Sequence, residues 1–253
     1  MTNSFSGRII KSTGSWYSVM DDAGTMFNCR LKGLFRTKGI MTTNPIAVGD
    51  IVDVTISEDE QTGVISKIHH RKNYLIRKST KLSKATQIIA ANIDQVVIIV
   101  SLIKPRTSTG FIDRILSTSE AYHIPSVIIF NKFDLYDDKT ISSLESLKKT
   151  YEKIGYKCLI TSVPEKLRLT QFKAILKGKI SLLSGHSGVG KSALINSIDS
   201  SLSLRTGEIS DYHSKGIHTT TFANMFRLKF SGFVIDTPGI KEFGLVEFEK
   251  VEL

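Results

Sequence analysis

The sequence predicts two domains of different class, a small all-β barrel followed by a larger α/β domain. Three observations indicate this: the chain has 253 residues, its composition is 41% hydrophobic and 23% charged, and its hydrophobic periodicity changes after Arg71. At about 150 residues per domain, this length allows one large domain or two modest ones. The composition is close to the average of globular proteins, so it excludes a disordered or fibrous chain.

The first part of the chain contains short β-type runs separated by turn signals. The pattern predicts five strands, at residues 7–10, 17–20, 25–31, 51–56 and 63–68. Five short strands in this length fit a closed barrel of the OB type, a fold that often binds oligonucleotides. We place this domain at residues 1–72.

After Arg71, apolar runs alternate with helical patterns. The predicted strands lie at 95–101, 126–131, 157–162, 180–185 and 230–236. The predicted helices lie at 111–122, 140–154 and 191–198. Strands that alternate with helices favour a parallel sheet covered on both faces. We place this α/β domain at residues 73–253, with a polar connection near residues 70–80.

Apolar runs and cysteines limit the possible classes of protein. Runs such as 96–100 and 127–130 are far shorter than the roughly 18 residues of a membrane span. The N-terminus has no basic segment followed by an apolar stretch, so it predicts no secretory signal. We therefore expect a cytoplasmic protein without a membrane partner, and we also expect a monomer. Cys29 and Cys158 alone provide neither a disulfide framework nor a four-ligand zinc site.

The formal net charge of +10 favours a polyanionic partner such as RNA. A predicted barrel loop around residues 33–35 carries four basic residues as candidate phosphate contacts, namely Arg30, Lys32, Arg36 and Lys38. A solvated basic loop is the alternative interpretation. Trp16, Tyr17 and Phe35 could stack on bases, although aromatic residues in small barrels more often belong to the core.

The most specific motif is a phosphate-binding loop. The pattern G-x-x-x-x-G-K-[ST] is matched by Gly185-His186-Ser187-Gly188-Val189-Gly190-Lys191-Ser192, between a predicted strand and a predicted helix. Its backbone N–H groups would wrap phosphates, Lys191 would neutralise the β and γ oxygens, and Ser192 would coordinate Mg²⁺. We add Ala193 to the binding set, and expect His186 to be a bystander because the loop acts through its backbone.

A second motif completes the phosphate side of the predicted site. Asp236-Thr237-Pro238-Gly239 closes the predicted strand 233–235. Asp236 is placed to hold Mg²⁺ through water, and the Gly239 N–H can meet the γ-phosphate. This tetrapeptide is a common turn by itself, and it becomes informative when it is paired with the phosphate loop.

The residues after two other strands predict specificity for guanine. Asn131-Lys132-Phe133-Asp134 matches the pattern N-K-x-D, in which the carboxylate of Asp134 accepts two hydrogen bonds from guanine. Adenine lacks these donors, so the motif separates GTP and GDP from ATP. Thr161-Ser162-Val163 resembles the companion motif that contacts the base oxygen, although it is weakly specific by itself.

The order of these motifs is unusual. The base motifs at 131 and 161 precede the phosphate loop at 185 and the Mg²⁺ motif at 236, whereas GTPases usually run the other way. A circular permutation would preserve the sheet, because each strand keeps its spatial neighbours and only the connections move. The sequence therefore predicts a P-loop GTPase domain with circularly permuted topology.

A barrel followed by a rotated GTPase resembles the RsgA (YjeQ/YloQ) family of small-ribosomal-subunit-dependent GTPases over nearly the whole chain. The residues 71–77 and the segment Gly216-Ile217-His218-Thr219-Thr220-Thr221, similar to a G-R-H-T-T-T first switch, add to this resemblance. The resemblance implies GTP hydrolysis stimulated by the small subunit during late assembly, with the barrel on ribosomal RNA near the decoding region. The family continues into a zinc-binding C-terminal domain, which we expect to be absent from this chain through truncation or natural shortening.

The catalytic residues predicted here are Lys191 and His218. Ile240 follows Gly239 where ordinary GTPases have a glutamine that orients the attacking water, so another residue must do this. His218 is the obvious substitute and agrees with the resemblance, while a surface histidine in a mobile loop is the alternative. One of the switch threonines 219–221 is an expected Mg²⁺ ligand. We name Thr220, although the spacing does not distinguish it from the other two.

Two rival functions stay open at this level. One is an RNA-binding assembly factor that holds GTP or GDP as a structural ligand with negligible hydrolysis. The other is a P-loop ATPase or kinase, in which the segment 131–134 is coincidental. Nucleotide competition would identify the second, and turnover with and without ribosomal subunits would identify the first.

Overall fold

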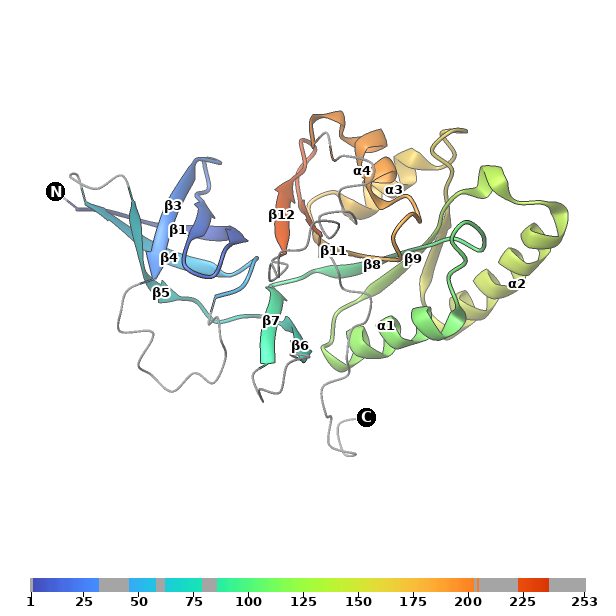
Figure 1. Cartoon of the computed structure of the whole chain (residues 1–253), viewed down its shortest axis with the longest axis horizontal. Coiled ribbons are helices and arrows are strands. Elements are labelled where there is room, and N and C mark those ends of the chain that lie inside the picture. The colour runs from blue at the N-terminus through green and yellow to red at the C-terminus, as the bar shows by residue number, and fades with distance from the viewer. Residues whose placement is uncertain are drawn as a thin grey trace, which may run out of the picture. The chain divides into compact units, whose positions relative to one another are not determined.

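The computed structural model describes residues 2–31, 46–57, 62–78, 86–202, 204 and 223–236 (Figure 1). The chain divides into two compact units. The first takes its described residues from 1–93 and 222–225, and the second takes them from 94–221 and 226–243. The domain limits 1–72 and 73–253 stay a prediction.

The first unit contains the predicted barrel, which the structure confirms. Its strands close in the order β1-β2-β3-β5-β4, and β4 returns to β1. All neighbours are antiparallel except β3 and β5. The strands are β1 (Thr2–Ser12), β2 (Tyr17–Met20), β3 (Met26–Leu31), β4 (Ile51–Ser57) and β5 (Gly63–Ile68).

Alternation along the barrel strands forms its core. Successive side chains of a strand point to opposite faces, so every second residue is directed inward. Ile9, Val19, Cys29, Val54 and Ile65 are completely buried in one cluster, each from a different strand. The apolar residues that predicted the strands are therefore the residues that fill the barrel.

A hairpin follows the barrel in the chain, where the sequence predicts a polar connection. It consists of β6 (Tyr74–Lys78) and β7 (Thr86–Ala91), which are antiparallel. The prediction was wrong here because the apolar run of β6 is only three residues long, Tyr74 to Ile76, and lies between the polar residues 71–73 and 77–79. Just before the hairpin, Arg71 Nε and Nη2 both donate to the buried carboxylate of Asp50, each at 2.6 Å.

The second unit contains a parallel sheet with the order β10-β9-β8-β11-β13, and β12 lies beside β13. Its strands are β8 (Gln95–Val100), β9 (Ser126–Phe130), β10 (Lys157–Ile160), β11 (Ile180–Ser184) and β13 (Phe233–Asp236), while β12 (Asn224–Arg227) has its first two residues in the first unit and its last two in the second. Strands β8, β9 and β11 are buried along their whole length. This explains the unbroken apolar runs 96–100 of β8 and 127–130 of β9, since helices cover both faces of such a sheet.

Helices α1 and α2 lie on one face of this sheet, and α3 and α4 lie on the other (Figure 1). The helices are α1 (Thr109–Ala121), α2 (Asp138–Ile154), α3 (Leu169–Leu176) and α4 (Lys191–Ile198), with two short 3₁₀ turns, η2 (Phe133–Leu135) and η3 (Ser200–Leu202). Ser108 and Asp137 cap α1 and α2 by accepting backbone N–H groups. Helix α3 was not predicted, because it is short and lacks a capping side chain.

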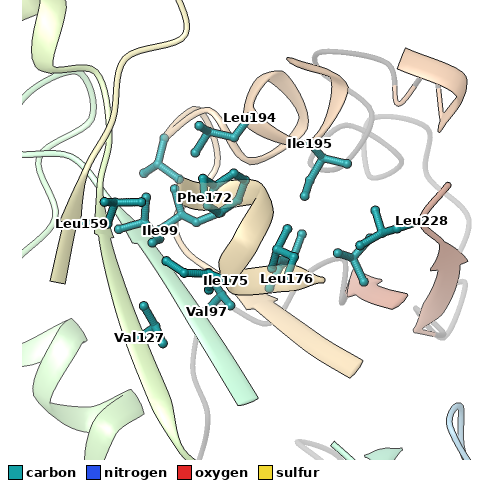
Figure 2. Close-up of a cluster of buried hydrophobic side chains, with 14 residues drawn as sticks. Val97, Ile99, Val127, Leu159, Phe172, Ile175, Leu176, Leu194, Ile195 and Leu228 are labelled. Atoms are coloured by element: carbon teal, nitrogen blue, oxygen red, sulfur yellow. The ribbon is translucent and has the colours of Figure 1, made fainter. Parts of the chain in front are cut away.

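The core of the second unit connects the sheet to α3 and α4. Figure 2 shows Phe172 of α3 near Leu194 of α4, and Leu176 of α3 with the sheet residues Val97 and Ile99 in the same cluster. Each of these five side chains is completely buried. Full burial of one such side chain stabilises the fold by about 1.5–3 kcal/mol. This packing holds α4, and with it the loop before α4, against the sheet.

No helix in the described part of the chain has the length and hydrophobicity of a membrane span.

Candidate functional site

The sequence motifs of the second unit come together at one edge of its sheet. The phosphate loop follows β11, the segment 131–134 follows β9, Thr161 follows β10, and Asp236 ends β13. The carboxyl ends of parallel strands meet at the same edge, where ligands of open α/β sheets bind. The topology therefore places motifs as far apart in the chain as Asn131 and Asp236 in one site.

Two glycines let the phosphate loop take its shape. Gly185 has φ +150°, and a Cβ there would lie 2.2 Å from the carbonyl oxygen of Ile99 on β8. Gly190 has φ +97° and forms the N-cap of α4, and its Cβ would lie 2.4 Å from Nδ2 of Asn131. Glycine alone fits both positions, because the backbone approaches its neighbours so closely.

Lys191 is the cation of this loop. Its Nζ donates to the carbonyl oxygens of Gly185 at 2.7 Å and His186 at 3.0 Å. Burial lowers the pKa of Lys191, and the carboxylate of Asp236 acts in the opposite direction. A desolvated ammonium held in the loop is suited to neutralise phosphate oxygens.

The ring of His186 connects the phosphate loop with α1. It packs on the ring of Phe111 at the start of α1, with 4.0 Å between the ring centroids and 34° between the planes. Burial lowers the pKa of His186, and the charge of Lys191 lowers it further. The second residue of the phosphate loop is thereby anchored to α1.

The donor set suits magnesium bound together with phosphates. The side chains of Ser192 and Asp236 are buried at the beginning of α4 and the end of β13. Mg²⁺ usually binds one or two protein oxygens together with substrate phosphates and waters, so a hydroxyl and a carboxylate are an appropriate pair. Within the described ranges, no three His, Cys, Asp or Glu side chains form a metal-binding group.

Asn131, on the base side, connects its own motif with Thr161 and with the phosphate loop. Its side chain is buried, its Nδ2 donates to the carbonyl oxygen of Val189 at 2.9 Å, and its Oδ1 accepts from Thr161 Oγ1 at 3.0 Å. The phosphate loop and the loops after β9 and β10 are thus joined through one amide. Because this amide is buried and has fixed partners on both sides, it defines the spacing between base and phosphate contacts.

The two charged residues of this motif also have fixed partners. Asp134 accepts from Ser162 Oγ at 2.7 Å, and this bond orients its carboxylate. Lys132 has φ +66° and ψ +36°, and its Nζ donates to the carbonyl oxygen of Lys104 at 2.6 Å. Val163 is partly buried and packs against the core. The segment 131–134 and residues 161–163 therefore form one hydrogen-bonded surface.

The described part of the chain does not include every candidate residue. His218, Thr220, Gly239 and Ile240 of the predicted site, with Lys32, Arg36 and Lys38 of the basic loop, lie outside the described residues. Arg30 lies on β3 of the barrel, and its guanidinium is 3.9 Å from the centroid of the Trp16 ring. The structure therefore brings together the base motifs, the phosphate loop and Asp236.

The sequence did not identify Tyr136. Its hydroxyl donates to the carbonyl oxygen of Asn131 at 2.8 Å, so it touches the base motif directly. A tyrosine two residues after the N-K-x-D pattern was the one sequence signal, and it carries no information until the fold brings β8 alongside.

Comparison with known proteins identifies the family. The model of the RsgA N-terminal domain matches residues 6–65, and that of the RsgA GTPase matches residues 68–246. The small ribosomal subunit biogenesis GTPase RsgA of Flavobacterium johnsoniae is 51% identical over 249 residues, which cover 98% of this chain and 77% of the relative. RsgA 2 of Bacteroides thetaiotaomicron is 49% identical over 247 residues, with 98% and 79% covered.

Two solved structures agree with this comparison. YjeQ from Thermotoga maritima matches with a TM-score of 0.76 and 33% identity, over 99% of this chain and 80% of its own. YloQ, described as a circularly permuted GTPase, matches with a TM-score of 0.71 and 27% identity, over 99% and 77%. The predicted family, barrel and rotated motif order are confirmed. The chain belongs to the RsgA GTPase family, and it is a GTP-hydrolysing enzyme with a circularly permuted GTPase fold.

Proposed function

We propose that this GTPase binds the small ribosomal subunit and hydrolyses GTP to GDP and phosphate during late subunit assembly in the cytoplasm. The observation that carries the proposal is the 51% identity over 98% of the chain to a protein named for small ribosomal subunit biogenesis. The basic character of the chain, with a net charge of +10, agrees with a ribosomal partner.

In this proposal the nucleotide lies along the edge formed by the motifs. Asp134 accepts the guanine N–H donors, with Thr161, Ser162 and Val163 along the base, and the backbone of residues 185–190 surrounds the phosphates. Lys191 neutralises the β and γ oxygens, and Ser192, Ala193 and Asp236 complete the phosphate end. When bound, Mg²⁺ supplies charge neutralisation at those oxygens.

The hydrolytic step needs a residue that orients water, and we propose His218 for it. The side chain of Ile240 has no hydrogen-bonding group, so it cannot orient water as the usual glutamine side chain does. Thr220 and Gly239 are proposed to meet Mg²⁺ and the γ-phosphate. His218→Ala should lower stimulated kcat while GTP affinity is retained, because orientation of water acts in the transition state.

The barrel is proposed to contact ribosomal RNA. Trp16 lies in the loop between β1 and β2 and is 37% exposed, and Arg30 covers one face of its ring. The loops and the β2–β3 face of OB-type barrels are common oligonucleotide surfaces, and bases stack well on aromatic and guanidinium planes. Arg30 would act together with Lys32, Arg36 and Lys38.

The test is GTP turnover with and without purified small subunits. We expect stimulation by small subunits, none by large subunits, and a weaker effect after the four basic residues are replaced by Ala. Their replacement should also reduce the logarithmic salt slope of subunit binding by about 0.7–0.9 for each phosphate that is no longer neutralised. Tightly bound nucleotide with negligible turnover in both conditions would favour the rival function, in which nucleotide is a structural ligand.

A further inference from the structure

We infer that Tyr136 is a positioning residue for guanine recognition, because its hydroxyl fastens Asn131 to the segment 101–108 between β8 and α1. This segment, called here the β8–α1 segment, belongs to none of the nucleotide motifs. The inference rests on the proposed nucleotide site and adds a specificity-determining residue to it.

The hydroxyl of Tyr136 joins two backbones. It donates to the carbonyl oxygen of Asn131 at 2.8 Å and accepts from the backbone N–H of Leu102 at 2.9 Å. The side chain is only 8% exposed, so water does not readily replace these bonds. Ser101 Oγ lies 3.3 Å away, but its own proton is donated to the carbonyl oxygen of Ile103, which leaves the tyrosine proton for Asn131.

Burial keeps this tyrosine in the form that can donate. It raises the pKa of Tyr136, and the nearby carboxylate of Asp134 adds to the rise, although the polar Ser101 hydroxyl and Leu102 N–H beside the phenol oppose it. The phenol is therefore neutral wherever the protein is folded near neutral pH, and its proton remains free to bond to Asn131.

Movement of Asn131 would affect several contacts at once. Its side chain bridges Val189 of the phosphate loop and Thr161, and the next residue, Lys132, is held by the carbonyl oxygen of Lys104. The β8–α1 segment thus holds the base motif at two points, through Tyr136 and through Lys132. Loss of the Tyr136 contact would let Asn131 move, and Asp134 would then be oriented less well toward the base.

The β8–α1 segment also lies beside the phosphate loop. A Cβ built on Gly188 would be 3.5 Å from Cδ of Pro105, and the Phe111 ring that follows the segment packs on His186. The segment therefore touches both the base and the phosphate ends of the site. In this arrangement, Tyr136→Phe removes only the hydroxyl group and changes the volume of the side chain little.

The experiment compares Tyr136→Phe with a matched control, Tyr151→Phe. Tyr151 is a buried tyrosine on α2, and its hydroxyl donates to Asp113 at 2.7 Å. Each variant lacks one buried hydroxyl, and only in the first does that hydroxyl bond to the base motif. Affinities for GDP, IDP and ADP are measured at a temperature where all the proteins are folded, together with single-turnover hydrolysis at saturating GTP.

We expect Tyr136→Phe to weaken GDP binding about tenfold, the equivalent of one hydrogen bond. IDP lacks the 2-amino group that Asp134 would bind, so the affinity for IDP should fall less than the affinity for GDP. The ratio of GDP affinity to IDP affinity, called here the GDP/IDP ratio, should therefore decrease. The hydrolysis rate at saturation should stay within about twofold, because the phosphate side is retained. Tyr151→Phe should leave the GDP/IDP ratio unchanged.

An unchanged GDP/IDP ratio in Tyr136→Phe, with GDP affinity within about twofold of the wild type, would overturn the inference. Ser101→Ala is a milder second variant. It removes the hydroxyl that bonds to the carbonyl oxygen of Ile103, next to the Leu102 N–H that donates to Tyr136. It should also lower the ratio of GDP affinity to IDP affinity. An equal shift in the Tyr151→Phe control would also overturn it. Equal affinities of wild-type protein for GDP and ADP would instead contradict the proposed nucleotide site itself.

Discussion

The base side and the phosphate side of the site are built in different ways. On the base side, side chains hold side chains: Thr161 donates to Asn131, and Ser162 donates to Asp134. On the phosphate side, backbone shape dominates, with Gly185 and Gly190 in conformations and close approaches that a Cβ would prevent. The base side should therefore respond to the removal of single polar atoms, and the phosphate side to added bulk or to removal of its cation.

Removal of the phosphate-side cation should have the largest effect. Lys191→Ala removes the ammonium that the loop carbonyls hold, and kcat should fall by about 10²- to 10³-fold, as when charge stabilisation is removed from other transition states. The measurement is multiple-turnover GTP hydrolysis. Lys148→Ala, at an exposed ion pair with Glu152 on α2, is the control and should retain the rate. Near-normal hydrolysis in Lys191→Ala would place the active site elsewhere.

A change of one atom on the base side should have the next largest effect. Asp134→Asn replaces an acceptor oxygen by a donor, so the pair of hydrogen bonds to guanine is broken and GTP affinity should fall about 10- to 100-fold. Xanthosine triphosphate should bind better to the variant than GTP does, since its 2-oxo group accepts where the guanine amino group donates. Competition between nucleotides measures both effects. Equal competition by GTP and ATP in the wild type would remove the guanine assignment.

Added bulk between the two sides should have an intermediate effect. Gly190→Ala places a methyl group against Nδ2 of Asn131, so it should weaken GDP binding by about tenfold and destabilise the fold by about 1–3 kcal/mol. Gly155→Ala is the matched control, because Gly155 also has a positive φ, +114°, but no atom within 4 Å of the new methyl group. It should cost about 1–2 kcal/mol of stability and leave GDP affinity unchanged. Equal GDP affinities of the two variants would show that Gly190 is needed only for its φ.

The smallest effect concerns pH. The pKa of His186 is lowered from its ordinary value near 6.5 by burial and then by Lys191, so the unfolded chain takes up this proton at a higher pH than the folded chain does. The contribution of the neutral ring is therefore present above about pH 6.5 and lost as the pH falls through the folded-state pKa. Between about pH 7.5 and pH 5.5, the Tm of the wild type should fall by more than that of His186→Asn. Equal falls would mean that the ring titrates as it does in the unfolded chain.

Strands and loops differ in how far the sequence predicts them. The predicted barrel strand 17–20 is found with the same bounds, because apolar Tyr17 and Val19 on either side of Ser18 are a local strand signal. The predicted strand 157–162 ends at Ile160, since Thr161 and Ser162 turn away to bond with Asn131 and Asp134. Helix α3 and the hairpin of β6 and β7 were missed, because their apolar residues become meaningful only against partners distant in the chain.

The sequence by itself determined the reaction class, because the phosphate loop and the N-K-x-D segment are contiguous patterns whose residue types follow from the ligand chemistry. Only the tertiary structure decided which residues support them. Tyr136 acquires its role when β8 lies next to β9 and brings the Leu102 N–H within 2.9 Å of the phenol. Such contacts depend on the pairing of strands, and a permuted chain keeps that pairing while its motif order changes.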